Sequence, residues 1–161
     1  MSKYQMVPAS EEHALELARN IRKEDAAELW ASAKETPTRA ILKSVKRSEE
    51  CLAGLVDGRV VCVFGVVPYS FLSNTGIIWM LATPELEVHA RAFLRRNKTW
   101  IAGVRQKFPR LINVVDARNT VAVKWLKWLG FTVKEPMPMG PFRLPFHSFE
   151  MRTEPCVIQQ P

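Results

Sequence analysis

The chain has 161 residues, of which 47% are hydrophobic and 24% are charged. This length and balance predict one globular domain with its own core, and they exclude a disordered or collagen-like chain. The 23 lysines and arginines exceed the 16 acids. The resulting net charge of +7 favours anionic partners such as nucleic acid, a membrane surface or a phosphorylated cofactor.

No apolar run approaches the roughly 18 residues that a membrane-spanning helix needs, and the first residues lack the apolar core of a signal peptide. The three cysteines, Cys51, Cys62 and Cys156, show neither CxxC spacing nor a matching histidine cluster. Reduced thiols and no metal site are therefore expected. These features together predict a soluble intracellular protein.

Four elements are expected in the first third of the chain: a strand over residues 4–7 and helices over 10–22, 25–34 and 36–48. Ser10 can cap the first helix, and Pro37 suits the first turn of the third. Two nearly continuous apolar runs, 51–56 and 59–67, are joined by Asp57-Gly58, which predicts a β-hairpin. Residues 76–81 then predict a central strand buried on both faces.

The second half alternates helices and strands. Thr83 and Pro84 begin one long amphipathic helix that is expected to run to residue 108. A buried strand over 111–115 and a helix over 119–129, ended by Gly130, follow. The tail, 131–152, carries four prolines and predicts one or two interrupted edge strands, and residues 153–161 are expected to be frayed.

The segment from residue 111 to residue 131 carries a recognisable spacing. Its buried strand leads to Asn119, with Ala122 three positions later, Gly130 at +11 and Phe131 at +12. This pattern resembles the last strand-helix unit of the GNAT superfamily of acyl-CoA-dependent N-acyltransferases, and the order of elements over 4–152 agrees with it. The resemblance implies an α/β fold in one domain over 1–161: a central mixed sheet of about six to seven strands flanked by helices.

The resemblance also implies a site for acetyl-CoA. The strands at 76–81 and 111–115 would splay apart at their C-terminal ends, and the first would bind the pantetheine arm through Met80, Leu81 and Ala82. The amides at the next helix start would hold the pyrophosphate. The residues expected there, within the turn 87–92, are Val88, His89, Ala90, Arg91 and Ala92. Asn119 would either cap its own helix or hydrogen-bond the arm.

The chain departs from that family at two places. Members typically carry a glycine-rich turn at the pyrophosphate, whereas residues 85–92 contain no glycine and include two acids, Glu85 and Glu87. Many members place a proton-donating tyrosine seven residues after the asparagine, and Leu126 stands there. A general-acid role would then pass to another group or be absent.

His89, His147, Asp116 and Tyr69 are candidates for proton transfer. A histidine titrates near neutrality and could deprotonate an ammonium nucleophile, although a lone histidine is more often structural or solvated. Asp116 follows the second splayed strand, where it could act in catalysis, cap the helix or pair with Arg118. The first three are the predicted catalytic residues.

Arg91, Arg95 and Lys98 fall on one helical face, where they could hold a phosphate or a nucleic-acid backbone, or simply face solvent. Trp79, Trp125 and Trp128 have the spacing of core residues.

A closer resemblance is carried by a series of motifs along the chain. They are RKEDAAELWAS (22–32), GVVP (65–68), IIWMLAT (77–83), RAFL (91–94), NVVDARN (113–119), AVKWLKWLGF (122–131) and FHSFEMR (146–152). In this order they resemble a GNAT-like branch of tailed-bacteriophage proteins that includes an internal virion protein of short-tailed coliphages, and this branch is similar in lacking the glycine-rich turn.

Two functions follow from these observations, of which the first is the expected one and the second is its alternative. The first is transfer of an acyl group from acetyl-CoA to an amine of a small molecule or a protein. The second is a non-catalytic virion-associated or assembly role, with phage structural proteins as partners. A nucleic-acid partner is not favoured, because no helix-turn-helix, zinc or RNA-binding signature is present. No membrane partner is expected, and the location would be the host cytoplasm or the virion.

Overall fold

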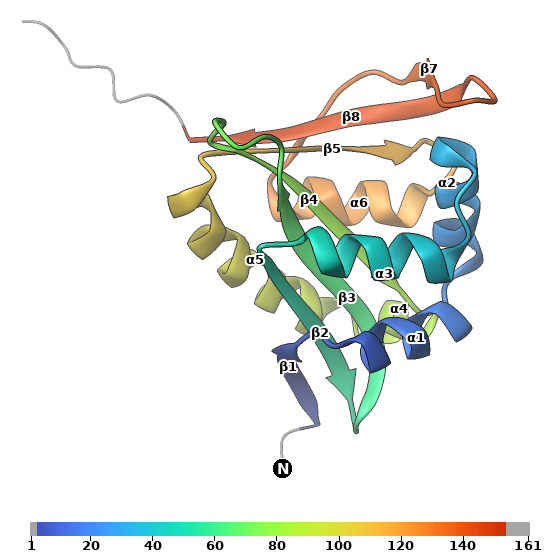
Figure 1. Ribbon diagram of the computed structural model, residues 1–161, viewed down its shortest axis with the longest axis vertical. Helices are drawn as coiled ribbons and strands as arrows, with labels where there is room; N and C mark the ends of the chain where they lie inside the picture. Colours follow the sequence, from blue (N-terminus) through green and yellow to red (C-terminus); the bar gives the residue numbers. More distant parts are fainter. Residues whose placement is uncertain (1–2, 154–161) are drawn as a thin grey trace, which may run out of the picture.

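The sheet has eight strands, one more than the upper end of the predicted range, in the order β1-β2-β3-β4-β5-β8-β6, with β7 also paired to β8 (Figure 1). The computed structural model describes residues 3–153. Its strands are β1 (Tyr4–Pro8), β2 (Glu50–Val56), β3 (Arg59–Pro68), β4 (Thr75–Ala82), β5 (Arg110–Asp116), β6 (Thr132–Val133), β7 (Met137–Met139) and β8 (Leu144–Arg152). All paired neighbours are antiparallel except β4 and β5, which are parallel.

The helices cover both faces of this sheet. They are α1 (Glu11–Arg19), α2 (Lys23–Ala33), α3 (Pro37–Arg47), α4 (Glu85–Val88), α5 (Ala90–Lys107) and α6 (Thr120–Leu129). The N-terminal helices pack on one face and α5 and α6 on the other. None of the helices between residues 3 and 153 has the length and apolarity needed to cross a bilayer.

The hairpin between β2 and β3 is confirmed. Asp57 and Gly58 both have positive φ angles, 46° and 80°, as the two-residue hairpin turn requires. Ser10 also caps α1 as predicted, through its hydroxyl and the amide of His13. The first helix ends at Arg19 rather than at residue 22, because a short link turns the chain toward the end of β4.

The long helix predicted from residue 83 to 108 is wrong in one respect: it is broken at His89 into α4 and α5. The amides of Leu86, Glu87 and His89 bond to carbonyls three residues earlier, which tightens the turn and ends α4. At the break His89 has φ −109° and ψ 16°.

The tail also differs from its prediction. Residues 144–152 form the long strand β8, which lies inside the sheet, between β5 on one side and β6 and β7 on the other. Pro138 and Pro145 face each other between β7 and β8, on the side of β8 away from β5. The full ladder with β5 therefore remains available to this strand. Of the segment expected to be frayed, residues 154–161 lie outside the described part.

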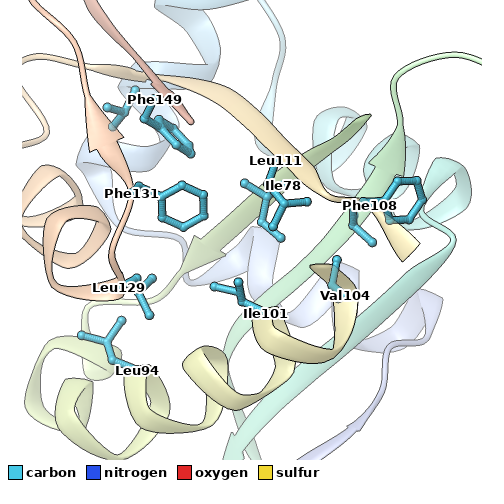
Figure 2. Close-up of a cluster of buried hydrophobic side chains, with 11 residues drawn as sticks. Ile78, Leu94, Ile101, Val104, Phe108, Leu111, Leu129, Phe131 and Phe149 are labelled. Carbon is cyan, nitrogen blue, oxygen red and sulfur yellow. The ribbon is translucent and has the colours of Figure 1, made fainter. Parts of the chain in front are cut away.

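The core between the sheet and the α5–α6 face is dominated by large apolar side chains (Figure 2). Ile101 and Val104 of α5 point toward Ile78 and Leu111 of the two parallel strands. Strand β4 is not buried throughout, since its burial alternates over its first residues. Helix α5 therefore packs on one face of β4 and β5 near the point where the two strands run side by side.

Candidate functional site

The parallel strands β4 and β5 separate part of the way along their length. Their register covers only Thr75–Ile77 against Arg110–Ile112. Beyond this point β4 stays paired with β3 as far as Ala82, and β5 stays paired with β8 as far as Asp116. The splay implied by the sequence resemblance is therefore present, and the site is the gap between the two strands.

The side chain of Asn113 lies where the gap begins. Its Nδ2 donates to the carbonyl of Ile78 at 2.7 Å, and its Oδ1 accepts from the amide of Val114 at 2.8 Å. In a continued parallel ladder the Val114 amide would itself donate to the Ile78 carbonyl. The Asn113 amide thus stands in for this ladder bond and satisfies both groups while the strands part.

The β4 edge of the gap is partly capped by the N-terminal end of α2. Every second residue of β4 turns its main chain toward the gap, so Ile78, Met80 and Ala82 share this orientation. The amide of Ala82 donates to Asp25 Oδ2 at 2.9 Å, and its carbonyl accepts from the Arg22 amide at 2.8 Å. No side chain among residues 3–153 bonds to the main chain of Met80.

A buried ionic cluster closes the wide end of the gap. Arg22 is only 1% exposed, and its guanidinium binds Asp25 Oδ1 at 2.8 Å and Glu87 Oε1 at 3.0 Å. It also lies 5.3 Å from the ring centroid of Trp125. Asn119 lines the cavity and donates to Asp25 Oδ1 at 3.0 Å, and it does not cap its own helix through its side chain. Burial raises the pKa of Asp25, and the charge of Arg22 opposes that rise.

Glu28 caps the β5 edge in the same way. Its Oε1 accepts from the amide of Asp116 at 2.7 Å. Burial raises the pKa of Glu28 to about 8. The hydrogen bond from Asp116 opposes this rise, and the negative charges of Asp25 and Asp116 add to it. At neutral pH this carboxyl is therefore largely protonated. Its ionised fraction, which can accept a proton, grows as the pH approaches 8.

A cavity of about 250 Å³ occupies the gap and reaches both faces of the sheet, since residues of α2 and α3 line one side and residues of α5 and α6 line the other. Two of its lining residues have buried polar atoms without a hydrogen-bond partner, Oδ1 of Asn97 and Nε1 of Trp100. Asn97 is 4% exposed. The cavity thus holds unused hydrogen-bonding capacity beside Met80.

The predicted catalytic residues do not meet in this cavity. Burial raises the pKa of Asp116, but hydrogen bonds from Arg118 outweigh this effect and hold the pKa below its ordinary value. Asp116 is thus paired with Arg118, which confirms that alternative. His89 bonds to the hydroxyl of Tyr4 at 2.9 Å, and His147 to the carbonyl of Lys134 at 2.8 Å. None of the three lines the cavity.

Tyr69, the fourth proton-transfer candidate, is 62% exposed and does not line the cavity. Among the tryptophans, Trp79 and Trp125 are partly buried, whereas Trp128 is 48% exposed and is not a core residue. Residues 3–153 contain no group of three or more histidines, cysteines and acids that could hold a metal ion.

Met80, Leu81 and Asn119, which the sequence predicted as cofactor-binding, do line the cavity, but the charged residues that cap the gap were not predicted. Arg22, Asp25 and Glu28 recur every three residues, which places them along one side of α2. This spacing was the available signal, but nothing local distinguishes it from an exposed charged face. Asn113 lies within an apolar strand and Asn97 among charged residues, and neither carried a local signal of its place in the gap.

No protein-family profile matches the chain, and no curated protein matches it by sequence. Solved structures do match. The structure of yncA from Salmonella typhimurium with its cofactor acetyl-CoA gives a TM-score of 0.71 at 13% identity, over 99% of both chains. The ribosomal-protein-S5-alanine acetyltransferase of Vibrio fischeri gives 0.68 at 14% identity, over 100% of this chain and 97% of its own. An acetyltransferase of the GNAT family from Streptococcus pneumoniae gives 0.63 at 13% identity, over 92% of this chain and 98% of its own.

The chain has the GNAT fold. A shared fold does not carry its chemistry with it, so binding of acetyl-CoA, the cofactor in the yncA structure, depends on the residues present. In the predicted pyrophosphate turn of this GNAT-fold chain, only some backbone amides are free to bind an anion. Its amides at Leu86, Glu87 and His89 are already engaged within the turn. Hydrogen bonds from Arg59 hold the pKa of Glu85 below its ordinary value, so this carboxylate is charged and paired with that arginine.

The other predicted cofactor-binding residues differ from one another. The main chain of Leu81 faces β3, and that of Ala82 is bonded to Arg22 and Asp25. Val88 is 80% exposed, and residues 90–92 form the first turn of α5, where no described side chain caps the helix and the backbone amides have no intrahelical partner. Of the arm-binding residues, only Met80 keeps its main chain toward the cavity. The groups predicted to hold acetyl-CoA are therefore divided: those of Ala82 are occupied by Arg22 and Asp25, whereas the main chain of Met80 and the first amides of α5 are unbonded within the described part of the chain.

Proposed function

We propose that this chain is a non-catalytic assembly protein associated with a phage particle, which reuses the GNAT fold as a scaffold. The observation that carries the proposal is the ionic cluster at the wide end of the gap. Arg22 and Asp25 occupy the main-chain groups of Ala82, and Glu87 stands in the turn where a pyrophosphate would have to lie. The phage context is supported by the ordered motifs that resemble the tailed-phage branch.

Two measurements test this proposal together. The full chain, tagged and expressed during phage growth, is expected to copurify with particles or with head or tail assembly intermediates. Calorimetric titration with acetyl-CoA at high micromolar protein is expected to give no binding heat. Absence from both particles and intermediates, or a clear acetyl-CoA isotherm, would contradict the proposal.

A second candidate is N-acyl transfer, favoured by one specific observation: the cavity opens to both faces of the sheet and contains Glu28. With its pKa of about 8, Glu28 could take a proton from an ammonium acceptor at mildly alkaline pH. A peptide with an N-terminal alanine is a reasonable acceptor to try, because one structural neighbour is an alanine acetyltransferase of a ribosomal protein. Acetylation above background by the native chain, lost in Glu28→Gln, would replace the assembly proposal.

A further inference from the structure

The positive charge of this chain is concentrated in one stretch. Residues 88–134 contain eleven lysines and arginines and a single acid, Asp116, whereas the rest of the chain contains twelve against fifteen. This stretch therefore carries +10 and the remainder −3. Helices α5 and α6 lie within it and contain no acid at all.

The two helices present their cations on adjoining surfaces. Arg91, Arg95 and Lys98 are exposed along α5, and Lys124 and Lys127 are exposed on α6. These five residues are called the basic face below. Lys98 Nζ lies 5.0 Å from the ring centroid of Trp128 on α6, which joins the two rows of charge.

The charges of the basic face are not neutralised by the protein. Within residues 3–153 none of its five residues forms a salt bridge, although Lys43 pairs with Glu35 and Arg110 with Glu150 elsewhere. A cluster of unpaired cations on two acid-free helices produces a positive potential that attracts a polyanion.

We propose that the basic face binds single-stranded nucleic acid through its phosphates, with Trp128 stacking on a base. Successive cations of α5 are about one turn apart, about 4.5 to 6 Å along the helix, so they can contact consecutive phosphates. Lysine is depleted from protein–protein interfaces, whereas most contacts to nucleic acids run from basic side chains to phosphates. The 48% exposed Trp128 adds the aromatic surface on which single strands stack.

The test measures fluorescence anisotropy of a labelled 20-nucleotide single-stranded DNA with the full chain. Each phosphate contact contributes about 0.7 to the slope of log affinity against log salt, so five contacts lower the affinity roughly 100-fold between 50 and 200 mM salt. The triple variant Arg91→Glu, Arg95→Glu, Lys98→Glu is expected to lose at least about tenfold in affinity at 50 mM salt. Trp128→Ala is expected to lose about fivefold or more, the effect of one stacked base.

The matched control reverses three exposed cations of α3, Arg39, Lys46 and Arg47, which changes the net charge by the same amount. This control is expected to keep most of the affinity, and thermal melts of all variants check that they fold. The proposal is overturned by any of four results: no binding at 50 mM salt, an equal loss in the control, no loss in Trp128→Ala, or competition by poly-glutamate as strong as by unlabelled DNA. The last result would assign the face to an acidic protein.

Discussion

At the scale of single residues, the gap is defined by side chains that take the place of missing backbone partners. Asn113 bridges Ile78 and Val114, while Asp25 and Glu28 accept from the amides at the ends of the two strands. Strands that part inside a protein leave donors and acceptors that must be satisfied, because a buried unpaired amide costs about 1 to 3 kcal/mol. These side chains meet that need without a ligand.

Glu28 makes the stability of the protein depend on pH. Its pKa is about 8 in the folded chain and near 4.5 when unfolded, so between these values the folded state holds a proton that the unfolded state has lost. The contribution of Glu28 to stability is therefore full below about pH 4.5 and is lost as the pH rises toward 8. From pH 5 to pH 8 this amounts to about 3 kcal/mol, at about 1.4 kcal/mol for each pKa unit.

The isosteric variant Glu28→Gln can still accept the Asp116 amide and does not titrate. Urea unfolding at pH 5 and pH 8 is expected to show a smaller loss of stability for Glu28→Gln than for the native chain. Glu12→Gln, on the exposed start of α1, serves as the control and is expected to keep the native dependence. Equal losses of stability between pH 5 and pH 8 in all three proteins would show that Glu28 does not cause the pH dependence.

At the scale of elements, the position of α2 decides what the gap contains. Its N-terminal turn caps β4, and its C-terminal end packs against the loop before β8, where Gly140 has φ 74°. A Cβ at Gly140 would clash with the carbonyl oxygen of Ala31 at the end of α2. The loop and the helix are therefore fitted to each other.

Gly140→Ala is expected to destabilise the protein by more than Gly58→Ala, as measured by urea unfolding. Both glycines have positive φ, so both substitutions carry backbone strain of about 1 to 2 kcal/mol. The space around Gly58 is open, whereas Gly140 also meets Ala31. Equal effects of the two substitutions would show that α2 is free to move away from the loop.

At the scale of the whole molecule, the sheet consists of two halves joined at one short parallel register. Strands β1 to β4 form one half, and β5 to β8 form the other. Only three residue pairs connect β4 with β5. Side chains from α2 and the helices on both faces therefore supply the remaining connection between the halves.

Amide hydrogen exchange followed by NMR provides a test of this description. The amides of Trp79 and Leu81 bond to β3, whereas the amide of Met80 faces the cavity. We expect Met80 to exchange at least about tenfold faster than its two neighbours, because it lacks a ladder partner. Equal protection of the three amides would mean that the gap is closed in solution.

Much of the fold could be predicted from sequence because its signals are local. The Asp57-Gly58 turn specifies a hairpin, Ser10 caps α1, and the apolar runs mark the buried strands. The spacing after Asn119 indicated the family whose fold the chain shares, and with it the splay of the two strands. Each signal lies within a single element or two neighbouring ones, where periodicity and turn chemistry act.

The content of the gap was decided only by tertiary structure. Asp25 and Ala82 are 57 residues apart, and Glu28 and Asp116 are 88 apart, yet each pair shares a hydrogen bond. A charged residue on a helix has the same local pattern whether it faces water or a strand end, so the sequence alone determined only that the second helix carries Asp25 and Glu28 on one side. Which surface that side meets depends on how the helix packs, because burial and pairing of a charge arise from contacts between distant segments.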